Sequence, residues 1–134
     1  MTTSPVIDSD LVERMYKWFN GLARRELPVT EAEVLEFWTD DCVMIINGHT
    51  RCVGPTAFAK HFNEIPQNLA RWKVVLPLDM KTMQPGQICA RYRINVVTTD
   101  GTAVSVLNGA FYNVRDGKLA SMTEVAHYER RDVR

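Results

Sequence analysis

The alternation of apolar and polar residues is clearest in the last third of the chain, where it predicts three consecutive β-strands over residues 88–98, 103–114 and 119–128. The strands are joined by Asp100-Gly101 and Asp116-Gly117. An Asp-Gly pair between β-branched and aromatic runs is a strong hairpin signal, because both residues tolerate the positive φ of a tight turn. Strands of this length, without helical spacing, indicate a strongly bent antiparallel sheet.

Helical spacing characterises the earlier part of the chain. Apolar residues recur at helical intervals over 10–25, and Thr30 and Glu33 form a capping box that opens a second, shorter helix. A third helix begins at Gly54-Pro55, since proline is tolerated at the first helical position. The sequence therefore predicts three helices ahead of the main sheet.

Extended segments lie between and after these helices. The β-branched run over 42–46, the Asn47-Gly48 turn and residues 49–53 predict a short hairpin. Residues 71–80 are also extended, and Pro77 within them indicates an edge strand or a bulge. Helices followed by a long antiparallel sheet predict an α+β fold with the helices gathered on one face of the sheet.

Composition and charge narrow the class of protein. The chain has 134 residues, of which 46% are hydrophobic, so residues 1–134 are expected to form a single domain with one core. Sixteen basic residues balance sixteen acidic ones, so we expect no nucleic acid and no membrane as partner. The expected partner is a small hydrophobic molecule or a second copy of the chain.

The cysteines and the N-terminal residues indicate a cytoplasmic protein. Three cysteines are too few and too unevenly spaced for a disulfide framework, and their odd number fits a reducing compartment. The first residues contain neither a basic region nor an apolar run, so we expect no signal peptide and no membrane anchor.

The sequence contains no motif for a metal, a cofactor or a covalent nucleophile. It has no His-Glu-x-x-His, no Cys-x-x-Cys, no Gly-rich phosphate loop and no Gly-x-Ser-x-Gly elbow. We therefore expect no metal and no cofactor, and we expect any chemistry to depend on acid/base side chains.

Three motifs and the order of the elements resemble the superfamily of nuclear transport factor 2 (NTF2), ketosteroid isomerase and the SnoaL-like cyclases. The motifs are Asp40-Asp41-Cys-Val-Met at a strand start, Gly54-Pro-Thr-Ala-Phe at a helix start and Asp116-Gly-Lys-Leu in the last hairpin. The resemblance covers nearly the whole chain. It implies a cone-shaped half-barrel of the cystatin-like or NTF2-like type, an apolar pocket inside it, and a homodimer. This fold hosts isomerases, dehydratases, epoxide hydrolases, aldol cyclases and binding modules.

Side-chain parity along the strands decides which residues face the pocket. A two-residue turn at Asp100-Gly101 would place Arg93 opposite Asn108, and a three-residue loop ending at Gly117 would place Asn108 opposite Glu124. The expected row across the concave face is Arg93, Asn108 and Glu124, flanked by Asn95, Met122 and Ala126.

A second register also agrees with the sequence. In the first register the outer face carries an apolar set, which consists of Tyr92, Ile94, Val96, Leu107, Phe111, Thr123 and Val125. Plain amphipathicity turns this set inward and leaves Arg91 and Arg93 in solvent. The resemblance implies that the outer face is buried in a homodimer, which favours the first register, and the two interpretations stay open.

Glu124 is the main candidate for chemistry. In the first register it lies among Ala120, Met122 and Ala126, so desolvation is expected to raise its pKa towards that of a useful general acid or base. The alternative is a structural role, in which Glu124 pairs with Arg93 or lies in solvent.

Limonene epoxide hydrolase resembles the chain at individual positions. Arg93-Ile-Asn95 falls on the arginine and the aspartate of its site, Glu124 on its last aspartate, and Asn47 near the asparagine that helps to hold the water. Because Asn95 cannot donate a carboxyl proton, epoxide hydrolysis by that route is not expected. Ketosteroid isomerase activity is not expected either, since Ile45-Ile46 occupies the position of its catalytic base.

These observations predict a SnoaL-like enzyme that performs cofactor-independent acid/base chemistry on a hydrophobic substrate, by isomerisation, cyclisation or hydration. The expected catalytic residues are Glu124, Arg93 and Asn95, and the expected substrate-binding residues are Tyr16, Trp38, Asn47, Asn108 and Met122. The alternative is a non-catalytic ligand-binding or dimerisation module, in which Glu124 and Arg93 neutralise one another.

Overall fold

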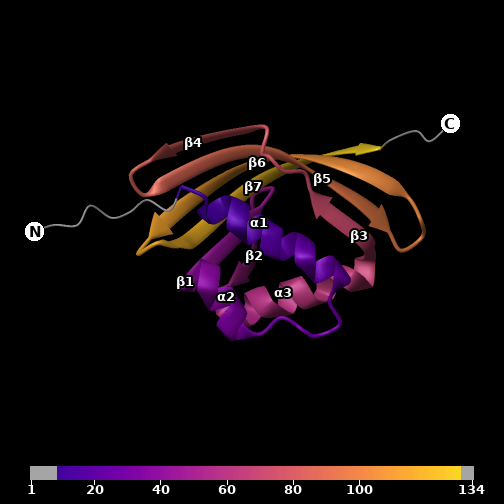
Figure 1. Ribbon diagram of the computed structural model, residues 1–134, viewed down its shortest axis with the longest axis horizontal. Helices are drawn as coiled ribbons and strands as arrows, with labels where there is room; N and C mark the ends of the chain where they lie inside the picture. Colours follow the sequence, from indigo (N-terminus) through magenta and orange to yellow (C-terminus); the bar gives the residue numbers. More distant parts are fainter. Residues whose placement is uncertain (1–8, 131–134) are drawn as a thin grey trace, which may run out of the picture.

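The computed structural model describes residues 9–130, and its helices and strands follow the predicted order (Figure 1). Within these residues the elements are α1 (Leu11–Gly21), the short 3₁₀ helix η1 (Leu22–Arg24), α2 (Glu31–Phe37), β1 (Trp38–Ile46), β2 (His49–Val53), α3 (Gly54–Asn68), β3 (Leu69–Val74), β4 (Met80–Gln84), β5 (Gln87–Thr98), β6 (Ala103–Arg115) and β7 (Lys118–Arg130).

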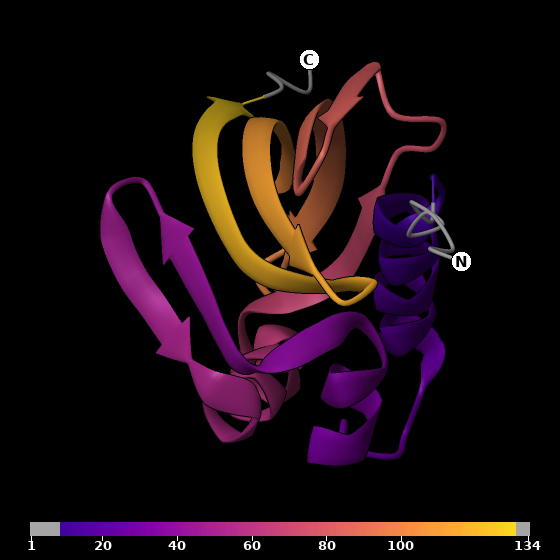
Figure 2. The same cartoon turned by 90° about the vertical axis from the view of Figure 1, so that its left-hand side faces the viewer.

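The strands form one strongly curled sheet. Its order is β2-β1-β7-β6-β5-β3, and β4 pairs with another part of the long strand β5. All neighbours are antiparallel except β1 and β7, which are parallel. The sheet arches over the helices, which lie on its concave side (Figures 1 and 2). The predicted α+β half-barrel is therefore confirmed.

Local sequence signals account for two of the helix starts. The Thr30 side chain accepts a hydrogen bond from the Glu33 backbone, and the Glu33 side chain accepts one from the Thr30 backbone, so the predicted capping box is present. Gly54 has a φ of 84° and begins α3, and Pro55 follows it where its missing N–H costs nothing.

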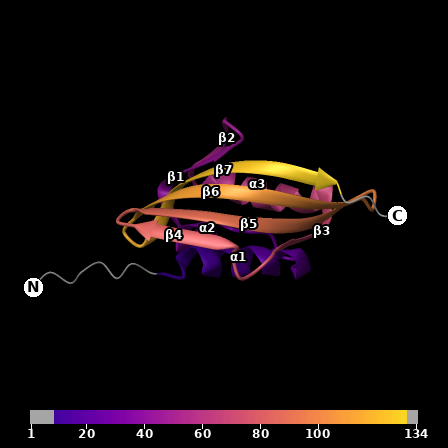
Figure 3. The same ribbon diagram turned by 90° about the horizontal axis from the view of Figure 1, so that it is seen from above.

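The extended segment predicted over 71–80 is two separate strands. β3 ends at Val74, and β4 begins only at Met80, so Pro77 lies between the strands and not within one. From above, β3 and β4 lie near opposite ends of β5 (Figure 3).

The core lies between the helices and the concave face of the sheet. Its fully buried side chains include Trp38, Phe58, Leu11, Val12, Val34, Tyr92, Tyr112 and Leu119. Aromatic contacts join the two layers, because Trp38 on β1 packs on Phe58 of α3 with ring centroids 4.7 Å apart.

The first hairpin corrects the predicted register. Val97 pairs with Ala103, so the turn contains one residue more than the predicted two, and residues 99–101 lie between the paired residues 98 and 102. One extra residue turns every side chain of β5 to the other face of the sheet. Tyr92, and not Arg93, therefore lies opposite Asn108.

The second hairpin differs from the prediction at two points, and the differences cancel. Arg115 pairs with Lys118 across a two-residue turn, in which Asp116 and Gly117 have φ values of 54° and 75°. A bulge near its start shifts β7 by one residue, so Asn108 pairs with Ala126. Two shifts restore the parity, and Glu124 and Asn108 face the same side.

Candidate active site

A cavity of about 760 Å³ opens between α1, α3 and the concave face of the sheet. Its lining is mainly apolar and aromatic, and includes Met15, Tyr16, Phe19, Trp38, Met44, Phe62, Trp72, Tyr92, Ile94, Val106, Met122 and Ala126. A concave, mostly apolar cavity of this volume, with a few polar groups, is typical of a site for a small molecule.

Glu124 is the carboxyl group in the interior of this cavity. Its side chain is only 7% exposed, and Ala110 is its direct partner on β6. Tyr92 donates a hydrogen bond from its hydroxyl to Glu124 Oε1 at 2.9 Å. Burial raises the pKa of Glu124 above the usual glutamate range, and the hydrogen bond from Tyr92 offsets part of that effect.

Three tyrosines surround this carboxyl group. The hydroxyls of Tyr16 and Tyr112 are hydrogen-bonded to each other, and the rings of Tyr16 and Tyr92 lie 4.8 Å apart. Each tyrosine is at most 5% exposed. Burial raises the pKa of all three well above the usual value, so their hydroxyls keep their protons at neutral pH and act as donors.

Tyr92 and Tyr112 are site residues that the sequence did not predict. The preferred register places Tyr92 on the outer face, and no motif singles out Tyr112. Both belong to the apolar set of residues that alternates with polar ones along their strands. This alternation is the observation on which the second register is based. The structure therefore supports plain amphipathicity for β5.

Two polar groups beside the cavity have no hydrogen-bond partner within residues 9–130. Asn108 donates from Nδ2 to the Val106 carbonyl at 3.1 Å, but its buried Oδ1 is unpaired, and so is the buried Nε1 of Trp38. Both residues line the cavity. An unpaired buried polar group costs about 1–3 kcal/mol, so a ligand that pairs with either group would recover this cost.

Arg93 and Asn95 do not belong to this cavity, and their predicted place in the row is wrong. The longer first turn moves both to the outer face of the sheet. There Arg93 forms an ion pair with Glu129 at 3.0 Å and donates to Ser105 Oγ at 3.3 Å. Asn95 is exposed and lines a different groove.

Asn47 contacts the backbone beside Glu124 and does not line the cavity. Its N–H donates to the Glu124 carbonyl at 2.8 Å, and its side-chain Oδ1 accepts from the Ala126 N–H at 2.9 Å. Asn47 has a φ of 49°, which asparagine tolerates better than most residues. The residue thus extends the pairing of β1 with β7 and fixes the backbone on both sides of residue 125.

Tyr16, Trp38, Asn108 and Met122 line the cavity, where the sequence placed them. Polar residues gather at one part of its lining, namely Arg51, Lys60, His61 and Glu64. Burial lowers the pKa of His61, and Arg51 lowers it further, so His61 is neutral at neutral pH. No motif in the sequence marks this histidine as a site residue.

No group of three or more His, Cys, Asp or Glu side chains in residues 9–130 could hold a metal ion. No helix in the same part of the chain is long and apolar enough to cross a membrane.

Replacement of Glu124 by Gln is expected to stabilise the protein at neutral pH. Folding raises the pKa of this carboxyl group, so the protein loses stability as pH rises above the pKa of the unfolded state. That pKa is about 4.3 for glutamate. Each unit by which folding raises the pKa costs about 1.4 kcal/mol in the free energy of unfolding at neutral pH. Glutamine avoids this cost, and its isosteric amide can still accept the hydrogen bond from Tyr92. Urea unfolding of both proteins across acidic to neutral pH measures this. A stability difference that does not grow with pH would contradict it.

The fold and the sequence together define the family. Residues 12–122 match the model of the SnoaL-like domain. The chain therefore belongs to the SnoaL-like family, and its fold is the NTF2-like half-barrel. No significant match exists among curated protein sequences.

Solved structures with the same fold come from several bacteria. A protein from Xanthomonas campestris pv. campestris that is provisionally named a polyketide cyclase is 22% identical, with 87% of each chain covered and a TM-score of 0.71. An NTF2-like protein from Anabaena variabilis is 17% identical, with 98% of this chain and 96% of that chain covered and a TM-score of 0.70. An LEH-like epoxide hydrolase from M. tuberculosis is 13% identical, with 87% and 80% covered and a TM-score of 0.69.

Proposed function

We propose that this protein is a cofactor-independent acid/base enzyme that acts on a small hydrophobic molecule, with Glu124 as its general base. The observation that carries the proposal is a buried carboxyl group inside an apolar cavity of about 760 Å³, held at one oxygen by the Tyr92 hydroxyl. A carboxyl group whose pKa burial has raised is a stronger base than an exposed one, and it operates nearer to neutral pH.

The arrangement suits proton transfer at a carbon next to a carbonyl group. Tyr92 donates to Oε1 of Glu124, and no hydrogen bond within residues 9–130 occupies Oε2. The ionised carboxylate would take a proton from the substrate carbon through Oε2, which leaves an enolate and a carboxylic acid. The acid would return the proton to another carbon, which is an isomerisation, or to the alkoxide formed by ring closure, which is a cyclisation.

The tyrosine hydroxyls and the low polarity of the cavity support the charged steps. Tyr16 and Tyr112 retain their protons and lie beside Tyr92, so the site contains donors in an environment that excludes much of the water. Hydrogen bonds to developing negative charge are stronger in such an environment than in water. Asn108 Oδ1 and Trp38 Nε1 would orient polar groups of the substrate.

Two other activities fit the site less well. Epoxide hydrolysis with two carboxyl groups would need a second acid near Glu124, but the other carboxylate of the cavity lining is Glu64 of α3. A base at the position of Ile45-Ile46, as in ketosteroid isomerase, is lacking. Glu124 as the one carboxyl group in the interior of the cavity, within residues 9–130, therefore favours isomerisation or cyclisation.

Deuterium exchange tests the proposal without knowledge of the natural substrate. Small apolar ketones, including cyclic and aromatic methyl ketones, are incubated with the protein in heavy water, and loss of their α-proton signals is followed by NMR. The proposal predicts exchange above the buffer rate for some of the ketones. Ketones that bind in the cavity, as shown by shifts of its resonances, but exchange no faster than in buffer would contradict the proposal.

A non-catalytic ligand-binding module is the alternative function. As predicted from the sequence, this module would have Glu124 and Arg93 neutralise one another. In the structure Arg93 pairs instead with Glu129, on the opposite face of the sheet from Glu124. The unpaired Asn108 Oδ1 and Trp38 Nε1 beside an apolar cavity would serve binding alone equally well. Binding of the ketones without exchange is the result that would favour this alternative.

We also propose that the outer sheet face forms a homodimer. Phe111 and Val125 are diagonal neighbours on this face and are 56% and 58% exposed, with Gly109 beside them. Replacement of both by Asp is expected to convert a dimer of the 15.3 kDa chain into a monomer, as measured by sedimentation equilibrium, because charges would be buried in an apolar interface.

Leu27 provides the control for this prediction. It is 75% exposed and lies in the loop between η1 and α2, outside the strands, so Leu27→Asp should leave the dimer intact. A wild-type monomer, or a Phe111→Asp/Val125→Asp protein that remains a dimer, would contradict the proposal.

A further inference from the structure

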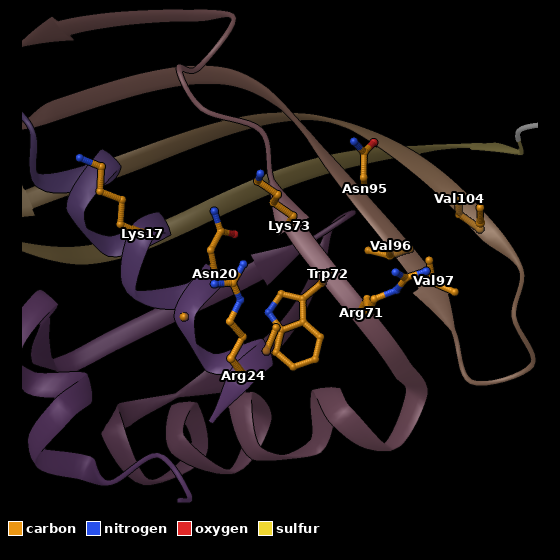
Figure 4. Close-up of a pocket in the computed structure, with 13 residues that line it drawn as sticks. Lys17, Asn20, Arg24, Arg71, Trp72, Lys73, Asn95, Val96, Val97 and Val104 are labelled. Atoms are coloured by element: carbon orange, nitrogen blue, oxygen red, sulfur yellow. The ribbon is translucent and has the colours of Figure 1, made fainter. Parts of the chain in front are cut away.

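A second cavity, of about 700 Å³, lies beside the edge strand β3 and outside the candidate active site (Figure 4). One side is formed by the last turns of α1 and by η1, and the other by β3 and the adjoining ends of β5 and β6. It shares only Trp72 and Val96 with the lining of the first cavity. We call it the β3 groove.

The β3 groove carries positive charge and no negative charge. Lys17 and Arg24 line it on the helical side, and Arg71 and Lys73 line it on β3. Figure 4 shows Arg71 beside Val97 and Lys17 turned away from β3. Among residues 9–130, no carboxylate contributes to its lining. The chain has as many acidic as basic residues, so this concentration of cations is local and does not follow from composition.

These four cations also differ from most other cations near the sheet and helices. Arg25, Lys81 and Arg93 each form an ion pair with a glutamate at 3.0 Å or less. Within residues 9–130, no ion pair or side-chain hydrogen bond involves any of the four groove cations. Like charges that line one depression repel each other, and an anion bound beside Arg71 and Lys73 would relieve part of that repulsion.

The remaining lining of the groove is largely apolar. It includes Ala23, Val96, Val97, Ala103 and Val104. The Asn95 amide is exposed and makes no hydrogen bond within residues 9–130, so it can donate to a ligand as well. Cations around an apolar surface match a molecule that has one anionic group and one apolar part.

The groove does not suit a nucleic acid. Single strands bind by stacking of bases on exposed aromatic rings. Trp72, the aromatic residue of the lining, is 5% exposed, and its Nε1 donates to the Phe19 carbonyl at 3.1 Å. The ring is therefore part of the wall and cannot serve as a stacking platform.

We propose that the β3 groove is a binding site for a small amphiphilic organic anion, whose carboxylate, sulfonate or phosphate group lies at Arg71 and Lys73 and whose apolar part lies on the adjoining Val97 and Ala103. The site is separate from Glu124, so it does not depend on the proposed enzymatic function. Phosphate-bearing and carboxylate-bearing ligands share this chemistry, and competition by inorganic phosphate or acetate tells them apart.

Anilinonaphthalene sulfonate is a suitable probe, because it combines a sulfonate with an aromatic body, and phenylnaphthylamine is its neutral counterpart. Fluorescence titration should give an affinity for the sulfonate that falls about tenfold or more in Arg71→Gln/Lys73→Gln, since two charge-assisted contacts are lost. Binding of phenylnaphthylamine should not change. In two-dimensional NMR, the sulfonate should shift the amides of residues 71–73, 95–97 and 103–104.

Arg91→Gln/Arg115→Gln is the matched control. Both arginines are exposed and lie outside both cavities, and their replacement removes the same net charge as Arg71→Gln/Lys73→Gln. Its affinity for the sulfonate should stay within about twofold of wild type, since exposed ion pairs contribute little. Equal loss in both double variants would overturn the proposal. So would sulfonate shifts confined to the first cavity, or tighter binding of a short oligonucleotide or of anionic vesicles than of the sulfonate.

Discussion

Glu124→Gln is expected to lower the rate of α-proton exchange by about a hundredfold to ten-thousandfold, which is the usual contribution of a general base. Glutamine has the same shape and can still accept the hydrogen bond that Tyr92 donates at 2.9 Å. It cannot take a proton from carbon. Binding of the ketone should therefore remain nearly unchanged while kcat falls, which separates a catalytic from a structural role.

Glu129→Gln is the matched control for this variant. Glu129 lies on the same strand, β7, but it faces outward and pairs with Arg93. Its replacement should leave the exchange rate within about twofold of wild type. Glu129 lies outside the cavity, and an exposed ion pair contributes little to the stability of the fold. If Glu124→Gln exchanges protons as fast as Glu129→Gln, Glu124 is not the base.

Trp38→Ala is expected to have the largest effect on stability, a loss of about 3–5 kcal/mol in the free energy of unfolding. Trp38 is 1% exposed, packs on Phe58, and forms a wall of the first cavity. Its removal leaves a void that the neighbouring strands cannot fill by small shifts. Urea unfolding measures the loss, provided that the variant is compared with wild type at the same pH.

Trp38→Phe separates the packing of the ring from its polar atom. Phenylalanine retains most of the contact with Phe58 but lacks the unpaired Nε1. Because Phe leaves a smaller void than Ala, we expect the free energy of unfolding of Trp38→Phe to exceed that of Trp38→Ala by at least about 1 kcal/mol. If the two variants are equally unstable, the ring of Trp38 does not support the fold as proposed.

The elements of this fold could be predicted because their signals are local. The capping box of Thr30 and Glu33, the start of α3 at Gly54-Pro55 and the two Asp-Gly hairpins each depend on a few neighbouring residues. The general order of helices and strands followed from them. The length of the last three strands indicated a bent sheet. The resemblance to the NTF2-like superfamily then implied the cone-shaped half-barrel and the pocket.

The register of β5 could not be predicted in the same way. One additional residue in the turn over 99–101 moves Tyr92 inward and Arg93 outward, and the sequence of that turn fits both lengths. Asn108 and Glu124 lie on the same face, as predicted, but only because two differences in the second hairpin cancel. Their predicted direct pairing is wrong, since Glu124 pairs with Ala110 and Asn108 with Ala126. The amphipathic pattern of β5, Tyr92 with Ile94 and Val96, was the better guide.

The polar groups beside Glu124 were hard to find for a different reason. Tyr16 and Tyr112 are 96 residues apart in sequence, and their contact exists only because α1 crosses the concave face of the sheet. No spacing along the chain reports a contact of this kind. The unpaired cations of the β3 groove likewise come from segments that are distant in sequence.

The central claim is that Glu124 is a desolvated carboxyl group that faces the cavity, and its own titration tests that claim most directly. NMR of protein labelled at the glutamate side-chain carboxyl carbon, with Glu124→Gln to assign the signal, gives its pKa. We predict a pKa above the ordinary glutamate value of about 4.3, because burial penalises the charged form. A Glu124 signal that titrates at or below the ordinary value would contradict the account.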